Sequence, residues 1–434
     1  MKITVIGAGY VGLVTGVSLA AAGRHDITFV ERNPARLEEL RRGRMPIEEP
    51  GLADAYAEAS SRIAVVESIA GAENPELVFV AVATPIGEDG ESDLGQIITA
   101  LKDLSRYSQV DISVRSTLPP GFSERIPALL GRADGERVST NPEFLRQGSA
   151  MHDFAKPSRI VIGRFPETSE RHLALIRGVY EHIDAPRIAV DVAAAELIKN
   201  AANAFLALKL SFVNEIAALS EGYGVEVEEV LAGIALDPRI GSTYMRPGLG
   251  FGGSCLPKEL RVVDVAGRRR GLAMHIARAA AQVNLEQQDR FAHRVLDEVP
   301  ATEARVGLLG LSFKADTDDM RGSPAVHVAR RLVQAGHTVV AFDPAVRPER
   351  ARDAVPGISL VSTAAEAFDG VDAVVLATEW PEFGSLDLAA LAPRMRRRIL
   401  FDGRGIVFPG AAAAAGIAYR GVGRRSLDPV EAPA

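Results

Sequence analysis

The sequence lacks the residues from which disulfide frameworks and cysteine-rich metal sites are built. Cys255 is the only cysteine among 434 residues, so an internal disulfide and a zinc site made of several cysteines are both excluded. Only eight histidines are present, and none stands in a His-x-x-x-His pair. We therefore expect no bound metal, and we expect a reducing, cytoplasmic setting for the single thiol.

Excess positive charge and long apolar runs are also missing. The formal net charge is −7, with 24% charged residues, which is a poor electrostatic match for nucleic acid. No uninterrupted apolar run has the roughly 20 residues that a membrane-spanning helix needs. The first residues, MKITVIGAG, resemble a strand rather than a signal peptide, since they have no basic head or cleavage site. We expect neither nucleic acid nor a membrane among the partners.

Strands and helices alternate in the first part of the chain. With 47% hydrophobic residues, 434 positions are enough for two or three domains with cores of their own. Buried strands are predicted at Ile3–Gly7, Ile27–Glu31, Leu77–Ala83, Ile112–Ser116 and Ile160–Gly163. Helical patterns lie between several of them, and this βαβ rhythm indicates a parallel, doubly wound sheet.

A long helix is predicted in the middle of the chain. Apolar residues recur at three- and four-residue steps over 192–221, and Gly222 ends the pattern. Shorter helices are predicted at 227–234 and 272–296. An apolar stripe of this kind is typical of a helix in a monomer core, and equally of one that contacts a partner subunit.

The βα rhythm returns near Ala304 and continues through four apolar strands. We therefore predict an α/β fold: two Rossmann-like, doubly wound parallel-sheet domains joined by a long central helix and a helical connector. The predicted segments are an NAD-binding domain at 1–192, a central helical domain at 193–300, a second α/β domain at 301–425 and a frayed tail at 426–434.

The first turn of the chain has a dinucleotide-binding pattern. Gly7, Gly9 and Gly12 have the G-x-G-x-x-G spacing, follow an apolar strand and open a helix, so backbone N–H groups can approach a pyrophosphate. Glu31 ends the next strand, where a carboxylate accepts hydrogen bonds from ribose hydroxyls and repels a 2′-phosphate. NAD is therefore favoured over NADP, although Arg32 beside it offers a guanidinium to such a phosphate. The alternative is a glycine-rich turn without a ligand.

Several polar residues follow strands of the first sheet. Thr84, Ser116, Thr117, Asn141 and Glu143 all stand where parallel strands end, and a ligand lying across these ends would meet them. Taken one at a time, each is more typical of a turn or a cap.

Two further features offer groups for chemistry. Lys199 and Asn203 stand four residues apart on one face of the long helix, where they could stabilise a developing negative charge; a solvated helix face is the simpler interpretation. Cys255 lies among glycines and near Lys258, which favours a thiolate, although a lone cysteine is usually a small buried apolar residue. A nucleophilic thiol beside a hydride acceptor indicates oxidation of an aldehyde through a thioester.

Together these residues resemble the nucleotide-sugar dehydrogenase family, which includes UDP-glucose and GDP-mannose dehydrogenases. The resemblance extends from Met1 to about Phe408. The motifs that carry it are GAGYVGL, ATP (83–85), STLPPG (116–121), NPEFLRQGSA (141–150), AELIKNAANAFLALKLSFVNE (195–215), RPGLGFGGSCLPKE (246–259) and GLSFKADTDDMRGSP (310–324).

The resemblance implies an enzyme that oxidises a sugar CH2OH group to a carboxylate in two NAD-dependent steps. The catalytic residues implied are Cys255 as nucleophile, Lys199 and Asn203 as oxyanion stabilisers, Thr117 and Glu143 at the water and the transferred protons, and Glu259. The implied NAD contacts are Gly7, Gly9, Tyr10, Val11, Gly12, Glu31, Arg36, Thr84, Thr117, Gln147, Lys258 and Arg321. The implied substrate contacts are Glu143, Phe144, Leu145, Lys199, Asn203, Arg239, Tyr244, Met245, Arg246, Pro247, Gly248, Gly252 and Lys314.

Three residues carry implications beyond this core set. Arg239 resembles an arginine that the family supplies from a neighbouring subunit, so a homodimer is expected. Glu259 stands where the family usually has aspartate, and Gln147 stands where it usually has glutamate. We expect activity to survive both changes.

The substrate is left with alternatives. ATEWPEF (377–383), LFDGRG (400–405) and SRIVIG (158–163) resemble the UDP-glucose branch, which implies oxidation at C6 to UDP-glucuronate. The run YMRPG (244–248) with the cysteine loop also resembles the GDP-mannose branch, and UDP-N-acetylhexosamines are a further alternative. Two other classes stay open: a single-step hydroxyacid dehydrogenase without need of Cys255, and an inactive protein that binds NAD or a nucleotide sugar.

Overall fold

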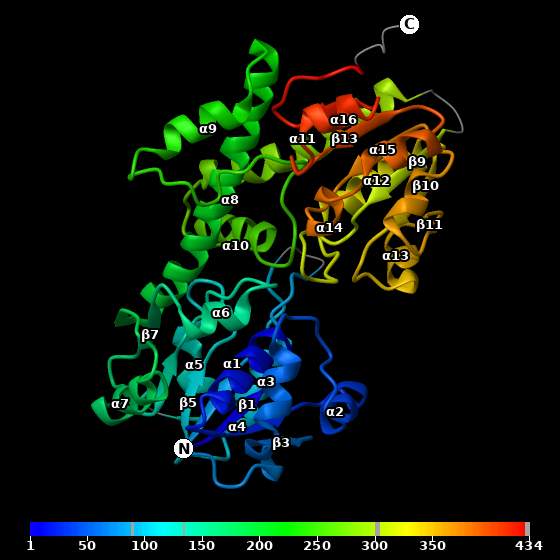
Figure 1. Cartoon of the computed structure of the whole chain (residues 1–434). Coiled ribbons are helices and arrows are strands. Elements are labelled where there is room, and N and C mark those ends of the chain that lie inside the picture. Colours follow the sequence, from blue (N-terminus) through cyan, green and yellow to red (C-terminus); the bar gives the residue numbers. More distant parts are fainter. Residues whose placement is uncertain (88–90, 133–134, 300–303, 430–434) are drawn as a thin grey trace, which may run out of the picture. The chain divides into compact units, whose positions relative to one another are not determined.

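The computed structural model describes residues 1–87, 91–132, 135–299 and 304–429, and the chain divides into two compact units (Figure 1). Unit 1 consists of Met1–Ala202 with Arg261–Leu272, and unit 2 consists of Asn203–Leu260 with Ala273–Ala434. The chain passes from one unit to the other within α8 (Val192–Tyr223), within α10 (Leu256–Arg269) and between Leu272 and Ala273.

Unit 1 contains an eight-stranded sheet of order β3-β2-β1-β4-β5-β6-β7-β8. Its strands are β1 Lys2–Ile6, β2 Asp26–Val30, β3 Ile63–Val66, β4 Leu77–Val80, β5 Asp111–Val114, β6 Val138–Thr140, β7 Ile160–Arg164 and β8 Arg187–Asp191. All neighbours are parallel except β6 and β7. The chain begins in the middle of the sheet and winds outward to both sides, so the order reverses between β1 and β4, where doubly wound folds bind ligands.

Helices cover both faces of this sheet, each over its own buried apolar cluster. One face carries α1 Tyr10–Ala21, α2 Pro34–Arg41, α3 Leu52–Glu58, α6 Ala150–Ala155 and α7 Glu170–Val179. The other carries α4 Gly95–Leu104 and α5 Ile126–Leu129. Three short 3-10 turns complete the unit: η1 Ser60–Arg62, η2 Ile69–Gly71 and η3 Ser123–Arg125.

Unit 2 contains a six-stranded, fully parallel sheet of order β11-β10-β9-β12-β13-β14. Its strands are β9 Arg305–Leu309, β10 Thr338–Phe342, β11 Ser359–Leu360, β12 Ala373–Leu376, β13 Ile399–Asp402 and β14 Ala418–Gly421. The two sheets confirm the predicted fold class of two doubly wound α/β units.

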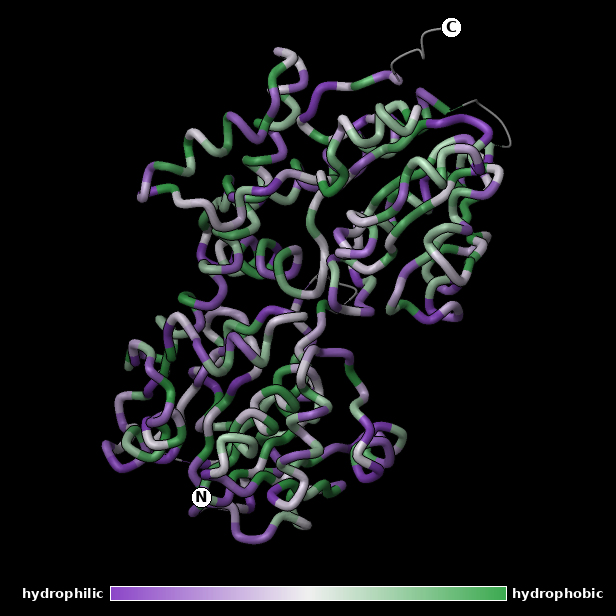
Figure 2. The backbone as a smooth tube through the Cα atoms, in the orientation of Figure 1, coloured by the Kyte–Doolittle hydropathy of each residue, from purple (hydrophilic) through white to green (hydrophobic). Residues whose placement is uncertain are grey.

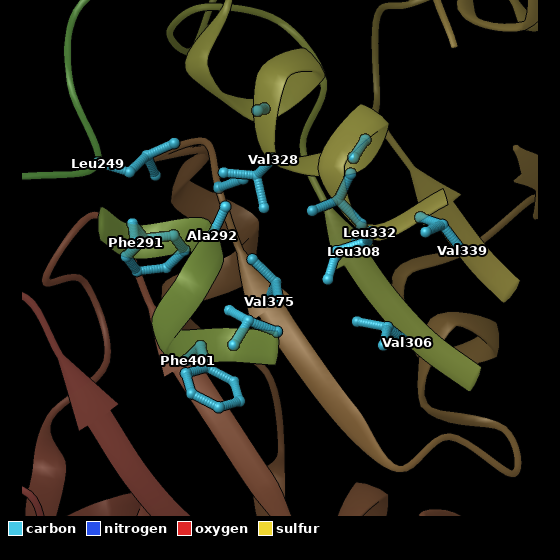
Figure 3. Close-up of a cluster of buried hydrophobic side chains, with 14 of the residues drawn as sticks. Leu249, Phe291, Ala292, Val306, Leu308, Val328, Leu332, Val339, Val375 and Phe401 are labelled. Atoms are coloured by element: carbon cyan, nitrogen blue, oxygen red, sulfur yellow. The ribbon is translucent and has the colours of Figure 1, made fainter. Parts of the chain in front are cut away.

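The core of unit 2 lies between its sheet and helices of the middle section. In Figure 3, Val306, Leu308, Val375 and Phe401 of the sheet lie near Phe291 of α11 and other buried side chains. This face carries part of α8, together with α9 Val227–Ala235, α11 His275–Glu298, α12 Pro324–Gln334 and α13 Pro348–Ala354. The opposite face carries η4 Ala364–Phe368, α14 Pro381–Gly384, α15 Leu388–Leu391, η5 Ala392–Arg394 and α16 Pro409–Ala414.

The strands predicted from sequence are present, whereas β3, β6, β8, β11 and β14 were not predicted. β8 was not predicted because its residues are largely exposed and do not form an apolar run, and β11 has only two residues. Helix α10, which begins at Leu256 directly after Cys255, was not predicted because the segment before it is rich in glycine. The predicted frayed tail is wrong for Leu427, whose N–H donates to the Tyr419 carbonyl at 3.1 Å while its own carbonyl accepts at 2.7 Å. Residues 430–434 of that tail lie outside the described residues.

Helix α8 corrects the expectation that no segment could span a membrane. Its best 18-residue window has a mean hydropathy of 1.3, so by length and composition it is long and apolar enough. Hydrophilic segments interrupt the hydrophobic ones along it (Figure 2), and its polar groups bond to protein. Ser211 donates to the Ala280 carbonyl at 2.7 Å, and Asn214 accepts from the Gly248 N–H at 2.9 Å. Such contacts are typical of a helix built into a protein fold.

Shortening a side chain in the core of unit 2 tests this packing. Phe401 is fully buried, so Phe401→Ala should lower the free energy of unfolding by about 3–5 kcal/mol through lost contacts and a cavity. Trp380, the only tryptophan, lies in this unit, so its fluorescence during denaturant unfolding provides the measurement. Phe408→Ala is the matched control, because Phe408 is 75% exposed. Equal losses in the two variants would contradict the assigned core.

Candidate active site

The turn between β1 and α1 combines close backbone contacts with open space. Gly7 has a φ of +96°, and a Cβ there would lie 2.8 Å from the Ala81 carbonyl oxygen. A Cβ on Gly12 would lie 1.9 Å from the Gly7 carbonyl oxygen, so helix and strand require glycine at both positions. A Cβ on Gly9 would meet no atom within 4 Å. The first turn of α1 has no acidic residue, so no carboxylate there opposes an anion at the N-terminus of the helix.

Glu31 is held in place directly after β2. It is 7% exposed, and its carboxylate accepts from the Asn33 N–H at 2.8 Å and lies 3.5 Å from the Arg36 guanidinium. Arg32, the residue that could have favoured NADP, forms an ion pair with Asp103 instead. A fixed carboxylate beside the glycine turn therefore fits the ribose of NAD and opposes a 2′-phosphate.

The loops after β4 and β5 lie against each other, as their predicted positions at strand ends require. The Thr84 hydroxyl donates to the Thr117 carbonyl at 2.8 Å, and the Ser116 hydroxyl donates to the Val82 carbonyl at 2.7 Å. Thr84 is buried and Thr117 is half-buried. Val11, in the first turn of α1, is also half-buried.

Lys199 and Glu143 form a buried ion pair. The Lys199 ammonium lies 3.0 Å from a Glu143 carboxylate oxygen and donates to the Glu143 carbonyl at 2.7 Å. Burial raises the pKa of Glu143, but the Lys199 charge and the Leu145 N–H, 2.6 Å from the carboxylate, outweigh it and leave this pKa below its usual value. The interpretation of a solvated helix face at Lys199 is therefore wrong, since the residue is only 4% exposed. Asn203, one turn later, is half-buried.

Phe144 lies between two cations. The Arg159 guanidinium is 3.7 Å from the centre of its ring, and the Lys199 ammonium is 5.3 Å from it. Cations attract the face of an aromatic ring, so the ring helps to hold Lys199 in its buried position.

Glu49 joins the cofactor turn to the loop that carries Gln147, and sequence reasoning missed it. The Tyr10 hydroxyl donates to its carboxylate, as do the N–H groups of Gly148 at 2.7 Å and Ala150 at 2.6 Å. Burial, and then the hydrogen bond to Glu49, raises the pKa of Tyr10. The sequence held no signal for this contact, because Glu49 lies about a hundred residues before the loop it binds.

Two further residues of α8 hold the loop that follows Thr117. Glu196 accepts from the N–H groups of Gly121 and Ser123, both at 2.7 Å. Asn200 donates to the Leu118 carbonyl at 3.1 Å. The i, i+3 and i+4 spacing of Glu196, Lys199 and Asn200 was a readable signal for one polar face, which the apolar stripe of the same helix obscured.

In unit 2, buried amides fix the segment that leads to Cys255. The Gly248 N–H donates to Asn214 at 2.9 Å, and its carbonyl accepts from Gln287 at 2.7 Å. Asn284 makes two hydrogen bonds with the Phe251 backbone, at 2.8 and 3.0 Å. All four of these hydrogen bonds engage backbone groups, so they leave the side chains of the segment to other contacts.

Leu249 inserts the same segment into the core of unit 2. It is fully buried, lies beside Phe291 in Figure 3, and its N–H donates to the Gly403 carbonyl at 2.9 Å. Arg404, which sequence reasoning did not single out, donates to the carbonyls of Gly250 at 3.2 Å and Phe313 at 3.1 Å. The motif 400–405 thus supports the cysteine segment directly.

Glycines bring the cysteine segment against the loop that follows β9. A Cβ on Gly252 would lie 2.3 Å from the Gly322 carbonyl oxygen, and the Gly253 N–H donates to the Arg321 carbonyl at 2.8 Å. Asp319, and to a smaller extent the Cys255 sulfur, raise the pKa of Arg321, which places a guanidinium within electrostatic reach of the thiol. Cys255 is exposed and stands immediately before α10, so the alternative of a small buried apolar residue is wrong.

The residues beside Cys255 on α10 lie in its first turn. Glu259 is 2% exposed, and its N–H donates to the Cys255 carbonyl at 2.9 Å. Lys258 is half-buried. The longer carboxylate at 259 is therefore accommodated inside the fold rather than displaced to the surface.

The remaining predicted substrate residues surround the other end of the segment. Tyr244 has a φ of +60°, an uncommon conformation for a residue with a side chain, and Lys209 steadies the preceding loop by donating to the Thr243 carbonyl at 2.6 Å. Arg239 is exposed and pairs with Asp237 at 2.5 Å. Met245, Pro247 and Lys314 are half-buried, and Arg246 is exposed.

Within residues 304–429, the loops after β9 and β10 differ from the glycine turn and the Glu31 position of unit 1. Its β9 ends at Leu309 but α12 begins only at Pro324, so no short strand-to-helix turn presents N–H groups to a pyrophosphate. Asp343 stands after β10, the counterpart of Glu31, but it accepts from the N–H groups of Leu311 at 2.7 Å and Ser312 at 2.9 Å. The Asp343 carboxylate therefore holds the backbone of the loop after β9.

Family models match three consecutive parts of the chain. Residues 1–184 match the NAD binding domain of the UDP-glucose/GDP-mannose dehydrogenase family, 193–286 match its central domain and 307–409 match its UDP binding domain. The chain belongs to the UDP-glucose/GDP-mannose dehydrogenase family. As a family member it is a nucleotide-sugar dehydrogenase that uses NAD, and the open glycine turn beside Glu31 fits that cofactor.

Relatives extend this similarity over nearly the whole chain. A UDP-glucose 6-dehydrogenase of Bacillus subtilis, YwqF, is 37% identical over 99% of this chain and 99% of its own. A UDP-glucose dehydrogenase of Pyrobaculum islandicum is 38% identical, covers 98% of both chains and superposes with a TM-score of 0.88. A UDP-D-ManNAc dehydrogenase of Pyrococcus horikoshii is 25% identical, covers 98% of this chain and 100% of its own, and gives a TM-score of 0.84.

Removing the carboxylate of Glu31 tests the cofactor site of this dehydrogenase. Glu31→Ala should raise the KM for NAD about 10- to 100-fold, because hydrogen bonds to a charged group contribute about 1.5–3 kcal/mol. The KM for NADP should change far less, so the ratio of the KM for NADP to the KM for NAD should fall. Initial rates with both cofactors provide the measurement. Glu38→Ala, an exposed carboxylate on the following helix, is the matched control. An unchanged KM for NAD would contradict the assignment.

Proposed function

We propose that this protein oxidises C6 of UDP-glucose to the carboxylate of UDP-glucuronate, with Cys255 as a covalent catalyst. The observation that carries the proposal is an exposed cysteine at the start of α10, in a segment fixed by buried amides and near Arg321. A helix N-terminus and a guanidinium both favour negative charge on sulfur, which is the nucleophilic form. The buried Lys199 and Glu143 pair supplies the accompanying acid–base groups.

Similarity favours UDP-glucose as the substrate. The two relatives at 37% and 38% identity are named as UDP-glucose dehydrogenases, whereas the UDP-D-ManNAc dehydrogenase is 25% identical. The UDP binding domain that matches residues 307–409 supports a nucleotide sugar. GDP-mannose and UDP-N-acetylhexosamines are the alternatives that a substrate comparison must separate.

In the proposed reaction, the Cys255 sulfur forms a covalent bond to the substrate. Bound NAD supplies the hydride acceptor for both oxidation steps. After the alcohol reaches the aldehyde level, the Cys255 sulfur forms a bond to the aldehyde carbon, and the carbonyl electron pair becomes an oxyanion. Loss of the second hydride from that carbon leaves a thioester. Water then attacks the thioester carbon, the carbon–sulfur bond breaks with its electron pair on sulfur, and the carboxylate is released.

The other residues have roles in charge and proton transfer. Lys199 and Asn203 donate hydrogen bonds to the oxyanions, and Glu143, kept anionic beside Lys199, accepts a proton from the attacking water. Thr117 positions that water, and Glu259 takes the place of the family aspartate.

We also propose that the protein works as a homodimer through α8. Phe205, Phe212 and Leu219 recur every seven residues on this helix and are 62%, 48% and 56% exposed. A row of large apolar side chains at this spacing is typical of a helix that packs on another helix. A second copy of the chain is the expected partner, in keeping with the intersubunit role implied for Arg239.

The ratio of NADH formed to sugar consumed tests the proposed reaction. UDP-glucose should yield two NADH per sugar and turn over faster than GDP-mannose or UDP-N-acetylated sugars. Cys255→Ser should lower turnover on the order of 10³-fold or more, because no thioester can form. Ser254→Ala is the matched control, since it changes the neighbouring residue without removing the thiol. A one-to-one ratio, or full turnover by Cys255→Ser, would refute the covalent role, and NAD binding without NADH formation would indicate an inactive relative.

Charge placed in the apolar row of α8 tests the dimer. Phe212→Asp should convert the dimer to monomers, since burying an unpaired carboxylate at a helix contact is strongly unfavourable. Light scattering coupled to size-exclusion chromatography gives the mass directly. Phe408→Asp is the control, because it places the same charge at an exposed phenylalanine outside the row. A monomeric wild-type protein would overturn the proposal.

A further inference from the structure

Arg115 is a buried cation without a carboxylate of its own. It follows β5 directly and is 4% exposed. Its guanidinium donates to the Asn141 side-chain oxygen and, at 2.6 Å, to the Tyr180 hydroxyl, and it lies 5.6 Å from the centre of the Phe79 ring. Within the described parts of the chain, no carboxylate comes within 4.0 Å of it. Burying a charge without an ion pair costs several kcal/mol, so such an arrangement calls for a reason.

Asn141 connects this cation to the site. Its side-chain oxygen also accepts from the Tyr180 hydroxyl at 2.5 Å, and its side-chain amide donates to the Val161 carbonyl at 2.7 Å. Its backbone N–H donates to the Val114 carbonyl at 2.7 Å. Asn141 is thereby fixed in orientation, and Glu143 stands two residues later.

We propose that Arg115 is a positioning residue for Glu143, which fixes the turn 141–143 through Asn141 and adds a second buried positive charge to that of Lys199. The inference rests on the role proposed above for Glu143. It assigns a task in the reaction to a residue whose hydrogen bonds lie entirely inside unit 1.

Two cations and one neutral phenol interact with Glu143. Lys199 lies on α8 and Arg115 at the end of β5, and the Tyr10 hydroxyl belongs to α1. Burial raises the pKa of Glu143, while Lys199, the Leu145 N–H and Arg115 together lower it below its ordinary value. Because Glu143 acts as an anion, activity is lost as the pH falls through this pKa. Removing the Arg115 charge raises the pKa and therefore moves the acid limb of the pH profile to higher pH.

Two substitutions separate charge from positioning. Arg115→Gln removes the charge but keeps an amide donor for Asn141 and Tyr180, and it should move the acid limb of kcat upward by about one pH unit. Arg115→Lys keeps the charge but loses the planar fork, and it should leave the limb in place while lowering kcat about tenfold at every pH. The KM for NAD should stay unchanged in both. A purely structural role would lower the folded fraction without moving the limb.

Failure of the inference and failure of the proposed function give different results. If Glu143→Gln is as active as the wild type, the role of Glu143 is wrong. If Glu143→Gln is inactive but a folded Arg115→Gln keeps the wild-type acid limb, only the inference about Arg115 is overturned. Should Arg115→Gln not fold by circular dichroism, Arg115→Lys still decides the positioning role, because wild-type kcat in that variant would refute it.

Discussion

The buried contact between Lys199 and Glu143 is the interaction on which the arrangement of the turn after β6 in unit 1 depends. An ammonium and a carboxylate at 3.0 Å, both almost completely buried, are stable only when neighbouring groups satisfy their remaining hydrogen-bonding capacity. The Leu145 N–H donates a hydrogen bond to the carboxylate. The ammonium donates to the Glu143 carbonyl and lies near the Phe144 ring. The pair therefore fixes the turn after β6 against α8, and it brings together groups that lie 56 residues apart in sequence.

The first turns of α8 extend this arrangement to a second loop. Glu196 and Asn200 flank Lys199 on the same buried face and hold the backbone that follows Thr117. The buried face of the first turns is therefore polar, whereas the apolar row at Phe205 and Phe212 further along the helix is exposed. Sequence periodicity locates two faces of a helix, but it does not say which one is inward. That is why a solvated face at Lys199 was the simpler interpretation, and why it was wrong.

Local rules explain which parts of the fold and site could be predicted. The glycine turn, its strand and Glu31 follow from backbone sterics within a few dozen residues, so their geometry was readable. Glu49, Arg115 and Arg404 act across long sequence separations on backbone groups or on Asn141, and no spacing rule reveals such partners. The motifs quoted for the family resemblance included Arg404 without giving it a task. The apolar pattern that predicts a strand results from burial rather than from hydrogen bonding. Exposed edge strands such as β8 do not have this pattern, so they were missed.

The six-stranded sheet repeats the order of the first six strands of the eight-stranded sheet, but the loops of the two sheets make different contacts. In unit 1, Gly9 adjoins open space, and Glu31 makes few contacts of its own. In unit 2, the corresponding acid, Asp343, is committed to the N–H groups of Leu311 and Ser312, so the loop after β9 is ordered without a ligand. That ordered loop carries Arg321 to the cysteine segment, with Gly252 and Gly253 permitting the close approach. The Asp343 carboxylate thus holds the loop from which the Arg321 backbone contacts the cysteine segment.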